Sequence, residues 1–307
     1  MAPAQRSRTR ATAPVDGSGP TFLGTLLGRK FRDIREENGA SREQVAEVLD
    51  VSVHAIARLE TAENKATVPQ VHLLCSHFKV PAETAAYMEQ LARRAKQRGW
   101  WSEYDQLGGP YAKIVAVENL VAASPTGEIR TWEPLIIPGL FQTPEYTRAL
   151  FERLELLSKS TGEPLGGPGG LPLDDQVASR QRRTQILEGD QPPRIWAIIG
   201  EGAFRMRVGG PEVMRKQIDH LLELSTRRNI VIQILRDDVG YHLGVSGAFT
   251  HYVFSKAADH SVVYHEGPRS FGDSIALIAR HDAAFRQLQA SATSLEDARS
   301  YLLQARS

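Results

Sequence analysis

Residues 42–61 of the chain read REQVAEVLDVSVHAIARLET, and their apolar positions are those of two short helices that cross steeply. The six inward-facing positions hold Val45, Ala46, Leu49, Val51, Ile56 and Leu59. Ala46 is small where the two helices approach most closely. Asp50 stands at the turn, where the backbone must accept a left-handed conformation, and aspartate tolerates this better than most residues. The pattern therefore predicts a helix-turn-helix motif.

The outer face of the second helix is predicted to meet DNA. Arg58 can offer a bidentate fork to guanine, His54 a single hydrogen bond, and Val53 an apolar surface to a thymine methyl group. The residues expected at the DNA phosphates are Arg42, Gln44, Ser52, Asn64 and Lys65. Two alternatives stay open: Arg58 pairs with Glu60 or Glu63 instead, and His54 and Lys65 are simply solvated.

The residues around the motif predict further helices. Leu23 to Asp50 has a helical pattern interrupted at Asn38-Gly39, and Ser41 with Gln44 has capping-box spacing. A third helix is expected from Ser52, with two more over 68–78 and 82–98. The predicted organisation is a disordered tail at 1–20, a DNA-binding domain at 21–80, a linking helix at 81–99 and a regulatory and dimerisation domain at 100–307.

Composition limits the class of protein. The 307 residues carry 37 basic and 36 acidic side chains, so a patch for nucleic acid must be local. Residues 1–98 hold fifteen Lys or Arg against eleven Asp or Glu, which points to the N-terminal end. Cys75 is the single cysteine, so an intramolecular disulfide is excluded. The sequence has no secretory leader and no apolar run long enough to cross a bilayer, and we expect a cytoplasmic protein without membrane partners.

After Gly99 the chain alternates between short β-branched or aromatic runs and helical segments. The predicted strands are 128–133, 194–200, 229–235, 247–255 and 261–265, and the predicted helices are 143–157, 174–188, 211–228 and 272–304. Residues 160–173 contain PLGGPGGLPL, which predicts a loop. The expected fold is therefore an all-α, five-helix head followed by an α+β domain with a mixed sheet.

Residues 41–60, SREQVAEVLDVSVHAIARLE, resemble the Xre or lambda-repressor-like head, in which a five-helix domain carries the motif on its second and third helices. Asp50 and Ala62 stand where that family commonly has glycine. The remainder resembles the long C-terminal domain of WhiJ-like and antitoxin-like actinobacterial regulators. The segments that carry this second resemblance are WWSEY (100–104), VENLVAA (117–123), IIPGLFQTPEYTRAL (136–150), RQRRTQIL (180–187), VGGPEVMRKQIDHLLEL (208–224) and VSGAFTHYVF (245–254). The resemblance implies a DNA-binding transcription regulator with a small protein partner encoded beside it.

Three roles compete for the second domain. The first is docking of that small partner and of a second copy of the chain, because heads of this kind read two half-sites as dimers. The candidate anchors are Trp100, Trp101 and Tyr104, for which packing in the core is the alternative. The second is a small-molecule pocket whose candidate polar groups are Tyr111, Glu118, Trp132 and Glu133. An antitoxin-like module that neutralises its partner, with DNA binding secondary, is a further alternative.

The third role is catalysis, which the sequence favours least. His242, His251, His260 and His265, with Glu266, lie close in sequence, but their spacing fits neither a helix face nor one side of a strand. No nucleophile-elbow, zinc-protease or phosphate-loop sequence occurs. We therefore expect a homodimeric, DNA-binding regulator that is not an enzyme and has neither a cofactor nor a metal.

Overall fold

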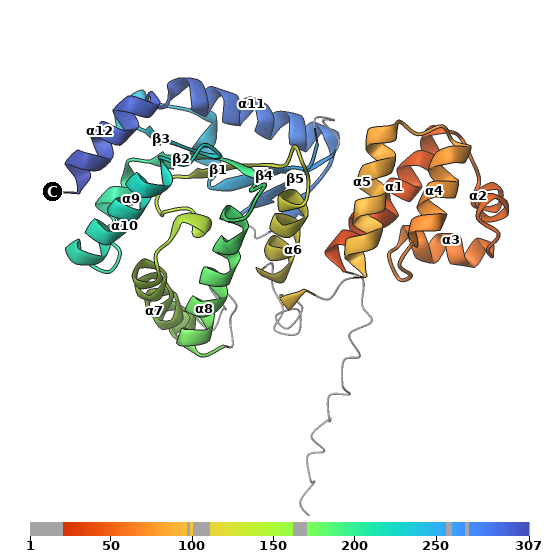
Figure 1. Cartoon of the computed structure of the whole chain (residues 1–307), viewed down its shortest axis with the longest axis horizontal. Coiled ribbons are helices and arrows are strands. Elements are labelled where there is room, and N and C mark those ends of the chain that lie inside the picture. The colour runs from red at the N-terminus through yellow and green to blue at the C-terminus, as the bar shows by residue number, and fades with distance from the viewer. Residues whose placement is uncertain are drawn as a thin grey trace, which may run out of the picture.

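The computed structural model describes residues 21–96, 99–100, 111–161, 171–255, 260–267 and 270–306 (Figure 1). Within these ranges, a head of five helices is followed by helices packed on both faces of a six-stranded sheet. The predicted fold class, a five-helix head and an α+β domain with a mixed sheet, is confirmed. The tail predicted at 1–20 lies outside the described residues.

The head helices begin and end close to the predicted boundaries. They are α1 (Phe22–Glu37), α2 (Arg42–Leu49), α3 (Val53–Glu60), α4 (Val68–His77) and α5 (Ala82–Ala95). The predicted capping box starts α2: the Ser41 hydroxyl accepts from the backbone N–H of Gln44, and the Gln44 side chain accepts from the backbone N–H of Ser41. Asp50 has the predicted left-handed conformation, with φ of 49°. The turn between α2 and α3 therefore forms as its sequence indicates.

The packing of the head fixes the position of α3. Five of the six inward positions of the motif are buried, and Val51 is partly buried. Helix α1 passes close to the end of α3 at Gly28, where a β-carbon would lie 2.5 Å from the carbonyl oxygen of Leu59. Helix α5, expected to link the two domains, packs on α1 and α4 and also touches α6. Helix α5 is thus part of the head and also connects the head to the second domain.

The sheet of the second domain mixes parallel and antiparallel pairs. Its strands are β1 (Glu128–Glu133), β2 (Arg194–Gly200), β3 (Ile230–Leu235), β4 (Phe249–Val253), β5 (Ser261–His265) and β6 (Ser270–Gly272), in the order β3-β2-β1-β4-β5-β6. The β1–β2 and β2–β3 pairs are parallel, and the β1–β4, β4–β5 and β5–β6 pairs are antiparallel. Central strand β1 therefore contributes alternate side chains to both faces of the sheet.

Helices cover both faces of this sheet (Figure 1). They are α6 (Tyr111–Ala122), α7 (Pro144–Thr161), α8 (Leu173–Arg183), α9 (Gly202–Arg205), α10 (Pro211–Leu224), α11 (Ile275–Ser291) and α12 (Leu295–Ala305). Helix α11 packs on the face that carries Trp132 and Phe249. Helix α6 packs on the opposite face and is buried along most of its length. Strand alternation places the β1 side chains Ile129, Thr131 and Glu133 on this α6 face of the sheet.

The second domain differs from the prediction in three of its elements or segments. Helix α6 and strand β6 were not predicted: α6 is apolar on nearly all sides and so lacks the periodicity of an amphipathic helix. The single helix expected over 272–304 is two helices, α11 and α12. Between them Thr293 is held by β3, because its carbonyl oxygen accepts from Gln233 and its hydroxyl from the backbone N–H of Ile234.

The head contacts the second domain through side chains of α1 and of the segment around β6. The ring of Phe22 lies 4.5 Å from that of Phe271, measured between centroids, and Phe271 lies 4.8 Å from Tyr264 in β5. Arg29 forms an ion pair with Asp273 beside this aromatic row. Helix α6 also touches α1 and α5. The face of the sheet that packs on α6 is therefore connected to the head by direct contacts.

Candidate functional site

Helix α3 leaves one side free of the head. Ser52, Val53, His54 and Arg58 are exposed, whereas Ile56, Leu59 and Glu60 of the same helix are buried. The Ser52 hydroxyl accepts from the backbone N–H of Ala55 and caps the helix. The outward face that the sequence predicted therefore exists, and an eight-residue helix of this kind has the dimensions of a major-groove reader.

Arg58 is oriented by the loop that follows α3. Its Nη2 donates to Oδ1 of Asn64 at 2.7 Å. It pairs with neither Glu60 nor Glu63, the two partners considered as alternatives: Glu60 binds other arginines, and the carboxylate of Glu63 accepts from Thr61. The guanidinium is thus exposed and has one hydrogen-bonded neighbour to hold it. Lys65, next to Asn64, is half-buried.

A buried carboxylate at the C-terminal end of α3 joins three helices, and the residue pattern did not predict it. The side chain of Glu60 is 1% exposed and accepts from Arg35 of α1 at 2.5 Å and from two nitrogens of Arg42 of α2 at 3.0 and 2.8 Å. The backbone carbonyl of Glu60 also accepts from Arg32. Burial raises the pKa of Glu60, but the hydrogen bonds from the arginines outweigh it and hold that pKa below its ordinary value. Glu60 is charged at neutral pH and fixes α3 against α1 and α2.

Arg42 and Gln44, expected at phosphates, have structural partners as well. Arg42 directs Nε and Nη2 to Glu60, and its side chain remains 42% exposed. Gln44 is exposed, and its side-chain oxygen caps α2. Both lie at the start of α2, where the backbone N–H groups of a helix attract anions. Their positions suit phosphate contacts made by the groups that remain free.

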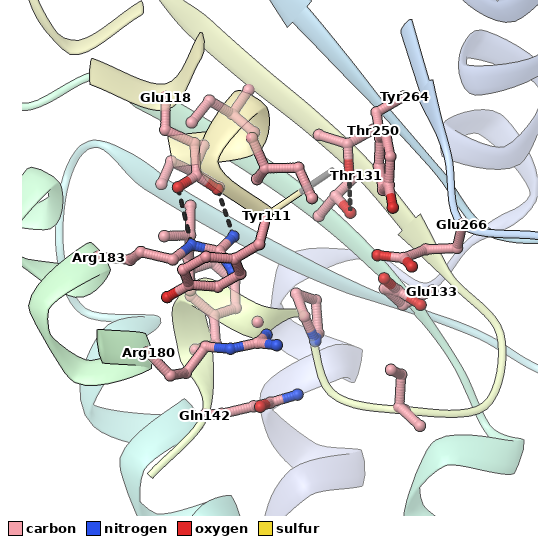
Figure 2. A pocket seen from close by; sticks show the side chains of 18 of the residues that line it. Tyr111, Glu118, Thr131, Glu133, Gln142, Arg180, Arg183, Thr250, Tyr264 and Glu266 are labelled. Atoms are coloured by element: carbon pink, nitrogen blue, oxygen red, sulfur yellow. Dashed lines mark hydrogen bonds and ion pairs between the residues drawn. The ribbon is translucent and has the colours of Figure 1, made fainter. Parts of the chain in front are cut away.

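A cavity of about 140 Å³ in the second domain lies between α6, α8 and the sheet (Figure 2). Of the residues expected to furnish a small-molecule pocket, Tyr111, Glu118 and Glu133 line it. Trp132 does not: it points to the α11 face, where its Nε1 donates to the carbonyl oxygen of Gly244 at 2.9 Å. Strand alternation separates Trp132 from Glu133 and places them on opposite faces.

Glu118 has a structural partner in this cavity. Its two carboxylate oxygens accept from Arg183 Nη2 at 2.6 Å and Nε at 3.0 Å, and both side chains are buried. The Tyr111 hydroxyl donates to Ser179 at 3.1 Å, and its ring lies under the Arg183 guanidinium. These contacts join α6 to α8. The sequence could not predict a pair 65 positions apart, and it also missed Arg180 and the place of Glu266 at the same cavity.

The other side chains singled out in the sequence are dispersed. Trp100 is half-buried with Arg182 over its ring, while Trp101 and Tyr104 lie outside the described residues. His260 faces the head, where it stacks on Tyr87 and bonds Thr84. Within the described ranges, no three His, Cys, Asp or Glu side chains come together as a set of metal ligands. In that same part of the chain, no helix is long and apolar enough to cross a membrane.

Comparisons with known proteins match both parts of the chain. Residues 26–88 match a family described as helix-turn-helix domain, and residues 118–304 match one described as domain of unknown function (DUF5753). No curated protein and no solved structure matches the chain. The first match covers α2 and α3 with their outward face, and the second covers most of the sheet domain and its cavity.

Proposed function

The chain belongs to the DUF5753 family and carries a helix-turn-helix domain at its N-terminal end, and from this we propose that it is a sequence-specific, DNA-binding transcription regulator of the Xre type. The observation that carries the proposal is the free face of α3, which the Glu60 network holds rigidly on the head. A rigid reading helix loses little conformational entropy when it enters the groove. The proposal is of a regulator rather than an enzyme, acting in the cytoplasm.

We assign the reading of bases to Val53, His54 and Arg58. The Arg58 guanidinium is held by Asn64 and so is directed before DNA arrives. We assign the phosphate contacts to residues that flank the outward face of α3. They are Arg42, Gln44, Ser52, Asn64 and Lys65. The division follows from position: the first group lies on the outward face of α3, and the second lies at helix starts and in the loop after α3.

The second domain is proposed to join two copies of the chain and to receive a small protein partner. A single head reads one half-site, and specific regulators of this type commonly bind two. An apolar loop supports a docking role, because Tyr241, Leu243 and Val245 are exposed within five residues of one another. Light scattering of the purified chain tests the dimer. A monomer both free and on DNA would contradict it.

The DNA-binding proposal is tested by selection of binding sites from random double-stranded DNA. The expected result is one enriched sequence, bound about 10³-fold or more tightly than random DNA at physiological salt. The affinity for random DNA should fall steeply with salt, because that binding is made by phosphate contacts. Enrichment of no sequence, with salt-independent or undetectable binding, would contradict the proposal.

A further inference from the structure

The cavity beside α6 contains polar groups of two kinds, those with partners and those without. Glu118, Arg183 and Tyr111 are engaged with one another and with Ser179. Gln142 is engaged too: its amide nitrogen donates to the carbonyl oxygen of Ile137 at 2.8 Å, and its amide oxygen accepts from Thr147. Such groups hold the walls in place and have little capacity left for a ligand.

Arg180 of α8 is different. Its guanidinium donates no hydrogen bond to any residue in the described part of the chain, and its Nε is fully buried there without a partner. It lies over the ring of Phe151, 5.1 Å from the centroid, and against Gly139. A β-carbon at position 139 would stand 2.1 Å from Nη1 of Arg180. Burial, and then the nearby Arg183, lower the pKa of Arg180 to about 10, so the group is still a cation at neutral pH.

An unpaired cation in such a position is costly for a folded protein. Transfer of a charged group from water to a protein interior is unfavourable unless an opposite charge and hydrogen bonds compensate it. Glu118, the buried carboxylate nearby, is already engaged with Arg183. Arg180 therefore fits a group kept for a ligand better than a group kept for stability.

Two carboxyl groups lie at the opposite side of the cavity from Arg180 (Figure 2). Glu133 of β1 is buried and makes no hydrogen bond with the described residues, and Glu266 follows β5 next to it. Burial, and then the Glu266 carboxylate, raise the pKa of Glu133 well above its ordinary value. Glu133 thus holds its proton more firmly than an ordinary glutamate does. Apolar side chains also line this cavity. They include Ile114, Ile129, Leu140, Phe141, Phe151 and Ile195.

We propose that this cavity binds a small organic carboxylate that carries a hydrogen-bond donor at its far end, such as a hydroxy- or amino-substituted ring acid. The ligand carboxylate pairs with Arg180, the donor reaches Glu133 and Glu266, and the apolar part fills the space between them. An apolar cavity of roughly 150 Å³ accommodates benzene, so the enclosed part of the ligand has the size of one ring. A ligand without the carboxylate leaves Arg180 unpaired and binds weakly.

The site is placed to act on the head. Tyr264 lines the cavity and begins the aromatic row that continues through Phe271 to Phe22 of α1. Helix α6 forms another wall and touches α1 and α5. A ligand that draws α8 toward β1 also acts on α6, because Arg183 of α8 is paired with Glu118 of α6. Movement of α6 changes the surface on which the head rests. This regulatory step rests on the proposed DNA-binding function, whereas binding of the carboxylate does not.

The binding step is tested on the full chain with 4-hydroxybenzoate, by calorimetry and by thermal unfolding. We expect saturable binding and a higher Tm, weaker binding of benzoate, which lacks the donor, and no binding of 4-hydroxybenzamide, which lacks the carboxylate. Absence of binding by both carboxylates at concentrations up to about 10 mM overturns the proposal. Equal binding of the carboxamide overturns the role of Arg180.

Variants separate a ligand-binding Arg180 from a structural one. Arg180→Met should weaken binding of 4-hydroxybenzoate about 10- to 100-fold while the Tm of the free protein stays equal or rises, because a half-buried charge without a hydrogen-bond partner is removed. Arg182→Met, on the exposed side of the same helix, is the matched control and should bind as the parent chain does. Gly139→Ala should weaken binding by displacing the guanidinium. A lower Tm in Arg180→Met without loss of binding overturns the assignment.

The regulatory step is tested by DNA affinity with and without 4-hydroxybenzoate. We expect a change of about 5-fold or more, in either direction, that Phe271→Leu reduces without altering ligand affinity. Ligand binding with unchanged DNA affinity overturns the coupling. The carboxylate site is tested independently of DNA binding. Arg58→Ala, remote from the cavity, should bind 4-hydroxybenzoate as the parent chain does even where its DNA binding is lost.

Discussion

Replacing Glu60 by glutamine tests how the reading helix is held. The carboxylate accepts one hydrogen bond from Arg35 and two from Arg42. Glutamine keeps one acceptor but loses the charge and points N–H groups at a guanidinium. Arg42 is 42% exposed and can return to water, whereas Arg35 is 13% exposed and cannot do so fully. Because charged hydrogen bonds are lost and the largely buried Arg35 keeps its charge, we expect Glu60→Gln to lower the free energy of unfolding by about 2–3 kcal/mol.

The assay is urea unfolding of the full chain at two pH values. The pKa of Glu60 lies below its ordinary value of 4.5 in the folded protein, so its contribution is complete above that value and is lost as the pH falls through the folded-state pKa. The difference between the parent chain and Glu60→Gln should be present at neutral pH and shrink in acid. Glu63→Gln, at an exposed position, is the control. A difference at neutral pH below about 0.5 kcal/mol would refute the account.

Two substitution experiments and one labelling experiment test local features of the fold. Gly28→Ala should lower the free energy of unfolding by about 2–4 kcal/mol, because the new β-carbon meets the backbone of Leu59; an unchanged urea midpoint would contradict the close approach of α1 and α3. Asp50→Val should be about 1–2 kcal/mol less stable than Asp50→Gly, since φ is positive there; equal midpoints would argue against the left-handed turn. Burial raises the pKa of Cys75 to about 11, so iodoacetamide should label the native thiol at pH 8 about 100-fold more slowly than the unfolded chain, and equal rates would count against its burial.

The sequence predicts local features well because neighbouring residues determine them. The capping box of Ser41 and Gln44, the left-handed Asp50 and the strand limits of β1 and β2 agree with the prediction. Helix α6 was missed because it is buried on nearly all sides, and its apolar run has no helical period. A strongly periodic segment reveals its exposed face, and a fully buried helix has none.

The interactions that build the two sites join residues distant in sequence. Glu60 meets Arg35 from 25 positions away, and Glu118 meets Arg183 from 65. Such pairs depend on the packing of helices, which spacing along the chain does not encode. The alternation of Trp132 and Glu133 across the sheet was readable once β1 was assigned, and it separates two residues that were expected to share a pocket.

The affinity of Arg58→Ala for the selected DNA site tests the central claim most directly. Loss of a bidentate contact to guanine should weaken binding by about 1–3 kcal/mol, roughly 5- to 150-fold, and leave binding to random DNA nearly unchanged. Arg215→Ala, an exposed arginine on α10, is the matched control and should bind as the parent chain does. Fluorescence anisotropy at fixed salt measures all three proteins. Equal affinity of Arg58→Ala and the parent chain for the selected site would contradict the reading of DNA by this face of α3.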